Sequence, residues 1–494
     1  MISRQALAIG IGVALAGFGP ARAQPPTQGG APPAPSASPR PAQSGTPGAS
    51  VPHTLAEALA ATYSNQPALQ AERAKLRATD ENVPAALSGW RPTVVLAGTA
   101  GYGDGLSRAY SATLQDWQKL RTDRDIATAQ ATVTQPLYTG GKVEGNVNRA
   151  KDQDMAERAN LIAQEQTSFT NTVNAYVGVI EAQDLLTLNI NNEQVLQKQL
   201  DATNDRFRVG EITRTDVAQA EAALAGATAS RETAEGTLAT ARATYVQIVG
   251  FTPPADLVEP QPLVLPVRNE NQAATMASAN NPNVVSAQFN DSAAKDAIDV
   301  AFSQLLPQLS LQGQAFQEQN QGGRSADTNG YQVVAELSVP LYQGGAEYSA
   351  VRQAKQSEQQ TAKLVADAQR TAVQSAVNAW ETLVAATAAA DSTRSQIRAN
   401  AVALEGVERE AIVGSRTTLD VLNAQQALLN SRVTLVQNLA QLVTASYGVA
   451  AAIGRLTARD LHLPVPLYDE TAYYNAVKNK WVGLGDYATD QPGR

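Results

Sequence analysis

An internal duplication governs how this chain can fold. The segment 133–141 (VTQPLYTGG) returns 204 residues later as 337–345 (LSVPLYQGG). The pair Val209-Gly210 returns at the same spacing as Val413-Gly414. A repeat that keeps its spacing over such a length indicates one structural unit used twice, so each predicted element should occur in two copies.

Each copy contains the same series of predicted elements. A helical segment (54–88 and 272–304) precedes two strand-like runs, and a very long proline-free tract follows (142–209 and 346–413). Ala, Gln, Leu and Glu, which favour helices, are frequent in both tracts. Each tract would form a helix of about 100 Å at 1.5 Å per residue. A dimeric coiled coil is the simpler interpretation, but strict heptads are not sustained. Alanine on several faces favours helices packed on both sides, as in a helical barrel or bundle.

The strand-like runs alternate between apolar and polar residues. The pattern is clear in 308–316 and 331–339, and it is weaker in 93–101 and 127–135. Such alternation is typical of strands in an outer-membrane barrel, where apolar residues face lipid. A half-buried sheet in water has the same pattern, but the features of the N-terminus and the long helices favour the membrane. The spans that join the strands, about 103–126 and 317–329, are predicted to be extracellular loops.

The N-terminus has the features of an export signal. Arg4 precedes an apolar stretch from 6 to 18, and Ala21-Arg22-Ala23 matches a signal-peptidase cleavage site. The following residues are crowded with Pro, Ala, Gly and Ser, which predicts a disordered linker. The predicted organisation is a signal peptide (1–23), a disordered linker (24–52), a first repeat (53–254), an inter-repeat linker (255–271), a second repeat (272–456) and a C-terminal tail (457–494).

Four strands in one chain are too few for a closed barrel, since single-chain barrels begin at about eight strands. An open sheet edge is not viable in lipid because its N–H and C=O groups would have no partner. The barrel must therefore be shared between chains. Three chains would supply twelve strands and two would supply eight, so the sequence predicts an oligomer.

The composition argues against most forms of catalysis. The chain has no cysteine and only two histidines, His53 and His462, which excludes disulfides, thiolate metal sites and cysteine nucleophiles. A net charge of −8 without a basic run makes nucleic acid a poor candidate partner. Gly140-Gly141 and Gly344-Gly345 are similar to a phosphate loop, but no Lys-Ser/Thr follows, which favours a strand-to-helix corner. We expect no catalytic residue, cofactor or metal.

The segment 413–424 (VGSRTTLDVLNA) is the most specific motif in the chain. With the duplicated order of elements over about 54–465, it resembles the TolC family of outer-membrane channel proteins. The resemblance implies a mixed α and β protomer that gives four strands to a shared trimeric barrel and long helices to a periplasmic α-helical barrel. It also implies the outer membrane of a Gram-negative bacterium as the location.

The resemblance further implies the function and the partners. Members of the family act as the exit duct of tripartite efflux or type I secretion systems. The expected partners are two further copies of the chain, a periplasmic adaptor, an inner-membrane transporter of the ABC or RND type, and outer-membrane lipid. The segment Tyr468–Leu484 resembles the tails of members linked to type I secretion. An adaptor or other coiled-coil interaction protein is the main alternative, but it would have one helical hairpin rather than doubled strands. An enzyme ranks behind both.

The resemblance implies a periplasmic gate near 413–424. Arg416 would bond to Thr215 and Asp216 in the closed state, and Asp420 would contribute to an acidic ring that faces the pore. Asn423 stands where a second aspartate ring is expected. A further departure is Ala411, which occupies the place of an aromatic residue.

Helix capping offers a second explanation of the same residues. Gly210 and Gly414 are well placed to end the long helices. Thr213 and Thr417 then start the next helices, with Asp216 and Asp420 as capping-box partners. Capping explains both aspartates without a gate, but it does not explain Arg416, whose counterpart in the first repeat is Ile212. Both explanations stay open at this point.

Overall fold

The computed structural model describes residues 51–321 and 325–485. The predicted signal peptide, and the predicted linker up to residue 50, lie outside these residues. The first repeat contains α1 (Leu55–Asn65), α2 (Pro67–Asp80), α3 (Asn82–Leu87), η1 (Ser88–Trp90), β1 (Thr93–Ser111), β2 (Asp116–Tyr138), α4 (Lys142–Arg208) and α5 (Arg214–Val249). The second repeat contains α6 (Glu270–Asn280), α7 (Pro282–Phe302), η2 (Ser303–Leu305), β3 (Gln308–Gln319), β4 (Asp327–Ser338), α8 (Ala346–Ile412) and α9 (Thr418–Ala452). A short helix, α10 (Ala472–Val477), lies in the tail.

The duplication and the mixed α and β fold are confirmed. The long helices α4 and α8 each contain 67 residues, and they begin at equivalent positions of the two repeats. The shorter helical segments before the strands are divided at a proline. Gln66 and Asn281 are extended because a proline follows each of them and disfavours the helical conformation of the preceding residue.

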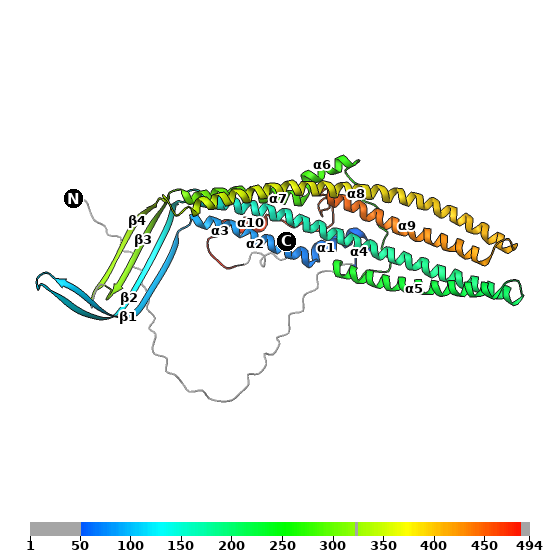
Figure 1. Ribbon diagram of the computed structural model, residues 1–494, viewed down its shortest axis with the longest axis horizontal. Coiled ribbons are helices and arrows are strands. Elements are labelled where there is room, and N and C mark those ends of the chain that lie inside the picture. The colour runs from blue at the N-terminus through cyan, green and yellow to red at the C-terminus, as the bar shows by residue number, and fades with distance from the viewer. Residues whose placement is uncertain (1–50, 322–324, 486–494) are drawn as a thin grey trace, which may run out of the picture. The chain divides into compact units, whose positions relative to one another are not determined.

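The helices pack as two long hairpins joined by α7. α4 lies against α5, and α8 lies against α9, while α7 contacts both α4 and α8 (Figure 1). The main core forms where α1, α4, α5 and the tail meet. Phe169, Tyr176 and Tyr245 are fully buried there. The hydroxyl of Tyr176 donates to the carbonyls of His53 and Val258 at 2.7 and 2.8 Å, so the core also fixes the residues that precede α1.

Two glycines stand at each corner between a strand and a long helix. Gly141 and Gly345 cap the starts of α4 and α8 with φ values of 85° and 87°, a conformation that favours glycine. Gly140 also has a positive φ, and a Cβ there would lie 2.8 Å from Leu306 Cβ. The predicted strand-to-helix corner is therefore present.

The four strands form one antiparallel sheet in the order β1-β2-β3-β4. The register places apolar residues opposite one another in rows that cross the whole sheet. One row is Leu96, Ala131, Ala315 and Tyr331, and the next is Val94, Val133, Gly313 and Val333. The intervening row is Val95, Thr132, Gln314 and Gln332, and its two glutamine side chains are hydrogen-bonded at 2.5 Å. One face of the sheet is thus apolar across all four strands, as the alternation predicts.

The predicted loop at 103–126 is wrong. β1 and β2 continue through this span as a hairpin, and their turn occupies only 112–115. β3 pairs with β2 only from Ala127 onward, so the outer part of the hairpin has no third strand. An ion pair between Arg121 and Asp104 (2.7 Å) and an edge-on contact between Tyr110 and Trp117 join its two strands. The second predicted loop is also shorter, because β3 extends to Gln319 and β4 begins at Asp327.

None of the helices that the structure describes combines the length and the apolar character needed to cross a membrane.

Candidate functional site

The two helical hairpins end in turns of the same type, shown at one end of the helices in Figure 1. In the first turn, the N–H groups of Gly210 and Glu211 donate to the carbonyls of Phe207 and Arg206, both at 3.0 Å. This pair of bonds is the Schellman motif, and Gly210 adopts its left-handed conformation with φ of 82°. The turn therefore satisfies carbonyls at the end of α4 that would otherwise lack partners.

The second turn repeats this arrangement. Gly414 donates to the carbonyl of Ala411 at 3.2 Å, and Ser415 donates to that of Glu410 at 3.0 Å. Gly414 has a φ of 79°. Ala411 is buried, so this position contributes to packing at the end of α8.

A capping box starts each helix that follows the turns. The carboxylate of Asp216 accepts hydrogen bonds from the backbone N–H (2.9 Å) and the hydroxyl (2.7 Å) of Thr213. Asp420 accepts the same two bonds from Thr417, both at 2.9 Å. These bonds stabilise the ionised form and lower the pKa of both carboxyl groups, first through the Thr213 side chain for Asp216 and through the Thr417 backbone for Asp420. Both aspartates are therefore charged at neutral pH.

Each turn is also bridged by an arginine–glutamate ion pair, but the two pairs have opposite polarity. In the first turn Arg206 lies before the turn and Glu211 after it, with Nε and Oε2 2.8 Å apart. In the second turn Glu410 lies before the turn and Arg416 after it, also at 2.8 Å. Glu410 is the repeat equivalent of Arg206, whereas Arg416 lies one position beyond the equivalent of Glu211, so the order of the charges across the turn is reversed in the second repeat.

The structure brings some of the predicted gate residues together and leaves others apart. Arg416 forms its ion pair with Glu410 of its own tip, and within the described chain it has no bond to Thr215 or Asp216. Thr215 is exposed in the first turn of α5. Asp420 and Asn423 lie three residues apart on α9 and so share a face of that helix. Both explanations of the tip are compatible with this geometry. The capping bonds account for the two aspartates, but they do not involve Arg416.

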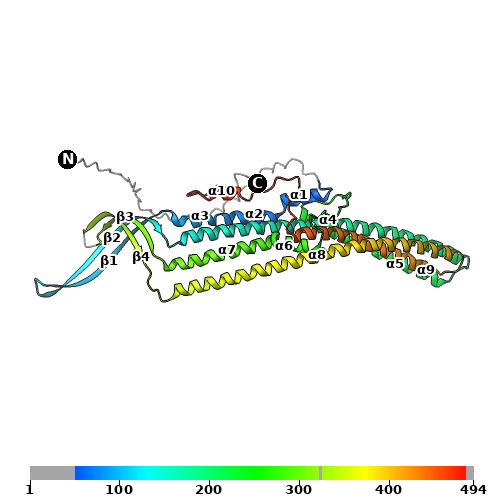
Figure 2. The same ribbon diagram turned by 90° about the horizontal axis from the view of Figure 1, so that it is seen from above.

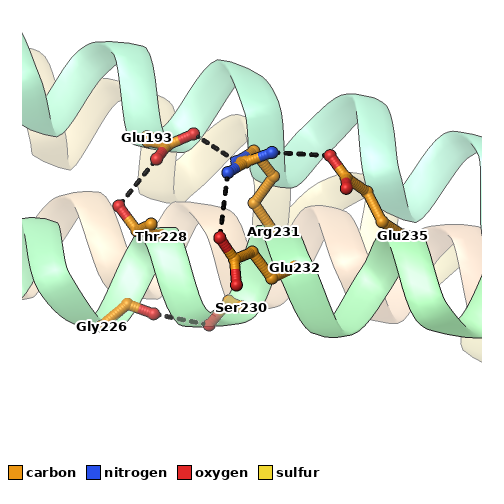
Figure 3. Close-up of polar contacts among 7 residues, drawn as sticks. All are labelled: Glu193, Gly226, Thr228, Ser230, Arg231, Glu232 and Glu235. Atoms are coloured by element: carbon orange, nitrogen blue, oxygen red, sulfur yellow. Dashed lines mark hydrogen bonds and ion pairs between the residues drawn. The ribbon is translucent and has the colours of Figure 1, made fainter.

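A polar cluster behind the first tip was not anticipated from the sequence. Figure 3 shows Glu193 of α4 between two side chains of α5, Thr228 and Arg231. Its carboxylate accepts from the Thr228 hydroxyl at 2.7 Å and pairs with Arg231 Nε at 2.8 Å. Arg231 also contacts Glu235 at 2.6 Å. The equivalents of Glu193 and Arg231 in the second repeat are Ile397 and Leu435. A comparison of the two repeats for charges present in only one would have indicated this cluster.

The second hairpin uses neutral contacts in the same region. Asn400 Nδ2 of α8 donates to the Ser431 hydroxyl at 3.2 Å, and Asn438 Nδ2 of α9 donates to the Thr393 hydroxyl at 3.0 Å. Nearer the tips, Leu196, Ala227 and Leu422 form a small apolar cluster that joins α4, α5 and α9. The two hairpins are thus in contact below their turns but are held together internally by different chemistry.

No group of three or more His, Asp or Glu side chains is placed to hold a metal ion in residues 51–321 and 325–485. The functional side chains of the tip are hydrogen-bonding and ionic groups on helix ends. Their arrangement can hold helices together and set an electric field, and both roles suit a gate.

Comparison with known proteins identifies the family. The model of the family described as "Outer membrane efflux protein" matches residues 58–250 and 273–455, one match for each repeat. The chain is 35% identical over 443 residues to the outer membrane efflux protein BepC of Brucella suis biovar 1, and the match covers 88% of this chain and 93% of BepC. It is 26% identical over 380 residues to the outer membrane protein TolC of Escherichia coli K12, covering 73% of this chain and 75% of TolC.

A solved structure shows the same fold. The outer membrane protein VceC of Vibrio cholerae superimposes with a TM-score of 0.69 at 19% identity, covering 81% of this chain and 96% of VceC. These similarities favour an outer-membrane channel over the periplasmic adaptor that was the main alternative. They also confirm the predicted location in the outer membrane with a periplasmic extension. The chain therefore belongs to the outer membrane efflux protein family, a family of outer-membrane channels.

Proposed function

We propose that three copies of this chain form an exit duct that receives substrates from an inner-membrane transporter and a periplasmic adaptor and releases them outside the cell. The observation that carries the proposal is the apolar face that crosses all four strands in register. A sheet with one continuous apolar face and one largely polar face suits a barrel wall between lipid and a water-filled lumen.

The free edges of the sheet support the shared barrel. β1 and β4 are the outermost strands, and each has one edge without a partner strand among the residues that the structure describes. In lipid these backbone groups require partners, and β4 of one copy can supply them to β1 of the next. Two copies would give eight strands, whose interior is filled by side chains. Three copies give twelve strands and leave room for a lumen, which a duct requires.

The difference in burial between the long helices supports the same assembly. α4 buries 21 of its residues within the chain, whereas α8, of equal length, buries seven. Apolar side chains of α8 that remain exposed include Leu364, Val384 and Val402. A neighbouring copy packed against α8 would cover them and continue the helical barrel.

The proposal assigns gate roles to the tip residues. Three copies of Asp420 would place three carboxylates at one level of the entrance, and Asn423 would line the next level without adding charge. Arg416 would exchange its partner Glu410 for Thr215 and Asp216 of a facing tip when the entrance closes. Its present ion pair is half-exposed and therefore weak, so the exchange requires little free energy.

The test is a measurement of mass and conductance on the same preparation. The chain is purified from outer membranes in detergent, its mass is determined by light scattering, and it is inserted into planar lipid bilayers. We expect the mass of three chains and discrete ion-conducting steps. A protein that remains a single chain, or a trimer that conducts no ions in any gate variant, would overturn the proposal.

A further inference from the structure

The C-terminal tail follows the first repeat toward the sheet. Figure 2 shows α10 beside α2 and α3, and α10 contacts α2. The backbone N–H of Tyr468 donates to the Tyr63 hydroxyl at 2.9 Å, near the start of this path. Farther along, the Tyr473 hydroxyl donates to Glu81 Oε1 at 2.9 Å. The tail is therefore attached at successive points that approach the strands.

Three arginines of the first repeat hold the aromatic side chains of the tail. The guanidinium carbon of Arg73 lies 5.1 Å from the centre of the Tyr468 ring, and that of Arg158 lies 5.4 Å from Tyr474. Each contact is a cation–π interaction, which suits a planar guanidinium and the face of an aromatic ring. Because the contacts recur along the tail, they fix its path rather than a single point.

The third arginine brings the tail to the edge of the sheet. Arg91 Nη1 donates to the carbonyl of Lys480 at 2.8 Å, and its guanidinium carbon lies 4.9 Å from the centre of the Trp481 ring. Only Pro92 separates Arg91 from Thr93, the first residue of β1. Trp481 is therefore held at the level where the strands begin.

Exposed apolar and aromatic side chains mark this level of the sheet. β1 and β3 begin here, and β2 and β4 end here, because the strands are antiparallel. We call these side chains the strand-end belt; they are Trp90, Leu137, Tyr138, Leu341 and Tyr342. Aromatic belts of this kind lie at the boundary between the hydrocarbon and the headgroups of a bilayer.

The last described residues of the tail have the chemistry of a membrane surface. Trp481 is 66% exposed, Val482 is 87% exposed and Leu484 is fully exposed, although all three are apolar. Lys478 and Lys480 precede them, and neither ammonium has a carboxylate partner among the described residues. Lys478 donates to Asn475 Oδ1 and Lys480 to the carbonyl of Gly485. Apolar side chains beside lysines whose charge is not neutralised by a described carboxylate fit a phospholipid surface, which offers hydrocarbon and phosphate together.

We infer that Trp481, Val482 and Leu484 insert into the phospholipid leaflet at the strand-end belt, with Lys478 and Lys480 on its phosphate headgroups. The tail thus forms a lipid-binding anchor on the periplasmic side of the barrel. The inference rests on the proposed function, because it requires the sheet to lie in the bilayer. It assigns the end of the tail a ligand, the phospholipid of the surrounding leaflet.

A spin-label experiment on the whole protein tests the anchor. The chain has no cysteine, so Leu484→Cys gives one labelling site, and the substitution is at a fully exposed position. The labelled protein is reconstituted in vesicles of phosphatidylcholine and phosphatidylglycerol. Collisions of the label with oxygen, which concentrates in hydrocarbon, are compared with collisions with a polar nickel complex, which is excluded from it. Val264→Cys is the matched control, because Val264 is apolar and 92% exposed in the linker between the repeats.

We expect the ratio of oxygen to nickel collisions at Leu484→Cys to be roughly tenfold higher than at Val264→Cys, because transfer of a polar complex into hydrocarbon is unfavourable. Equal ratios at the two sites would overturn the anchor. Tyr331→Cys, on the apolar face of β4, separates this failure from a failure of the proposed function. If the label at Tyr331→Cys is exposed to lipid and the label at Leu484→Cys is exposed to water, the sheet lies in the bilayer and only the anchor is rejected. Water exposure at both rejects the membrane position of the sheet.

Discussion

Replacing Asp80 by asparagine should stabilise the protein, and the gain should depend on pH. Asp80 is fully buried at the end of α2. Burial, followed by the hydrogen bond to Asp154 and its charge, raises the pKa of Asp80 to about 8. Glu81 adds to the rise, whereas Arg158, which pairs with Asp154 at 2.7 Å, opposes it. When both aspartates are ionised, neither carboxylate can donate a hydrogen bond to the other. When Asp80 is protonated, its O–H can donate to the carboxylate of Asp154.

The direction in which stability changes with pH follows from how tightly the folded and unfolded states bind the proton of Asp80. The folded state holds the Asp80 proton more tightly than the unfolded state, so folding is weakened as pH rises from the ordinary value of 3.8 to about 8. The interval spans about four pH units, each equivalent to about 1.4 kcal/mol, which gives an upper limit of about 6 kcal/mol. Relaxation of the protein around the ionised carboxylate makes the actual destabilisation smaller than this limit. We expect Asp80→Asn to raise the free energy of unfolding by about 2 kcal/mol per chain above pH 8.

The assay is thermal loss of helical circular dichroism in detergent at a series of pH values. The unfolding temperature of Asp80→Asn should match that of the wild type near pH 4 and exceed it increasingly toward pH 9. Asp201→Asn is the matched control, since Asp201 is exposed on α4, so the comparison separates the effect of burial from that of removing a charge. An increase in unfolding temperature that is the same at every pH, or a decrease at pH 9, would refute the assigned role of the buried Asp80 charge.

Four further predictions concern the tip, the hairpins and the topology. Arg416→Ser should raise single-channel conductance in planar bilayers because it removes the bonds that Arg416 would form with Thr215 and Asp216 of a facing tip when the entrance closes; unchanged conductance would leave capping as sufficient. Asp420→Asn should reduce cation selectivity, and Asn423→Asp should increase it, as read from reversal potentials under a salt gradient; equal potentials would place Asp420 away from the pore. Arg231→Gln should destabilise the first hairpin by about 1–2 kcal/mol, detected as faster proteolysis of α5 relative to α9. An epitope inserted at the 112–115 turn should be detected on intact cells, and detection only after permeabilisation would reverse the orientation.

The sequence predicted those elements that depend on local signals. Proline-free tracts that follow a glycine pair and end before a single glycine predicted α4 and α8 to within a residue, since helix initiation and termination are set by neighbouring residues. The capping boxes at the tips were predicted as well, because the threonine and aspartate of each box are only three residues apart. The outer hairpin was missed because 103–126 lacks alternation, and its strands are fixed by cross-strand contacts such as Arg121 with Asp104.

The contacts that depend on distant segments could not be predicted. The arginines that hold the tail lie far from it in sequence, as Arg91 and Trp481 illustrate. The partner of Arg416 also required the geometry of the turn, because Glu410 belongs to the preceding helix. Sequence reasoning thus located the candidate site but not the pairing of its charges.

The covalent link between the repeats has a genetic consequence. If the unit had remained a separate chain, every copy in a ring would carry identical residues, and each substitution would appear in all of them. Joined in one gene, the two copies diverge independently, and the oppositely ordered pairs Arg206–Glu211 and Glu410–Arg416 record that divergence. Selection can therefore alter the tip of one repeat while the tip of the other is preserved. An assembly of unlinked half-length subunits lacks this freedom.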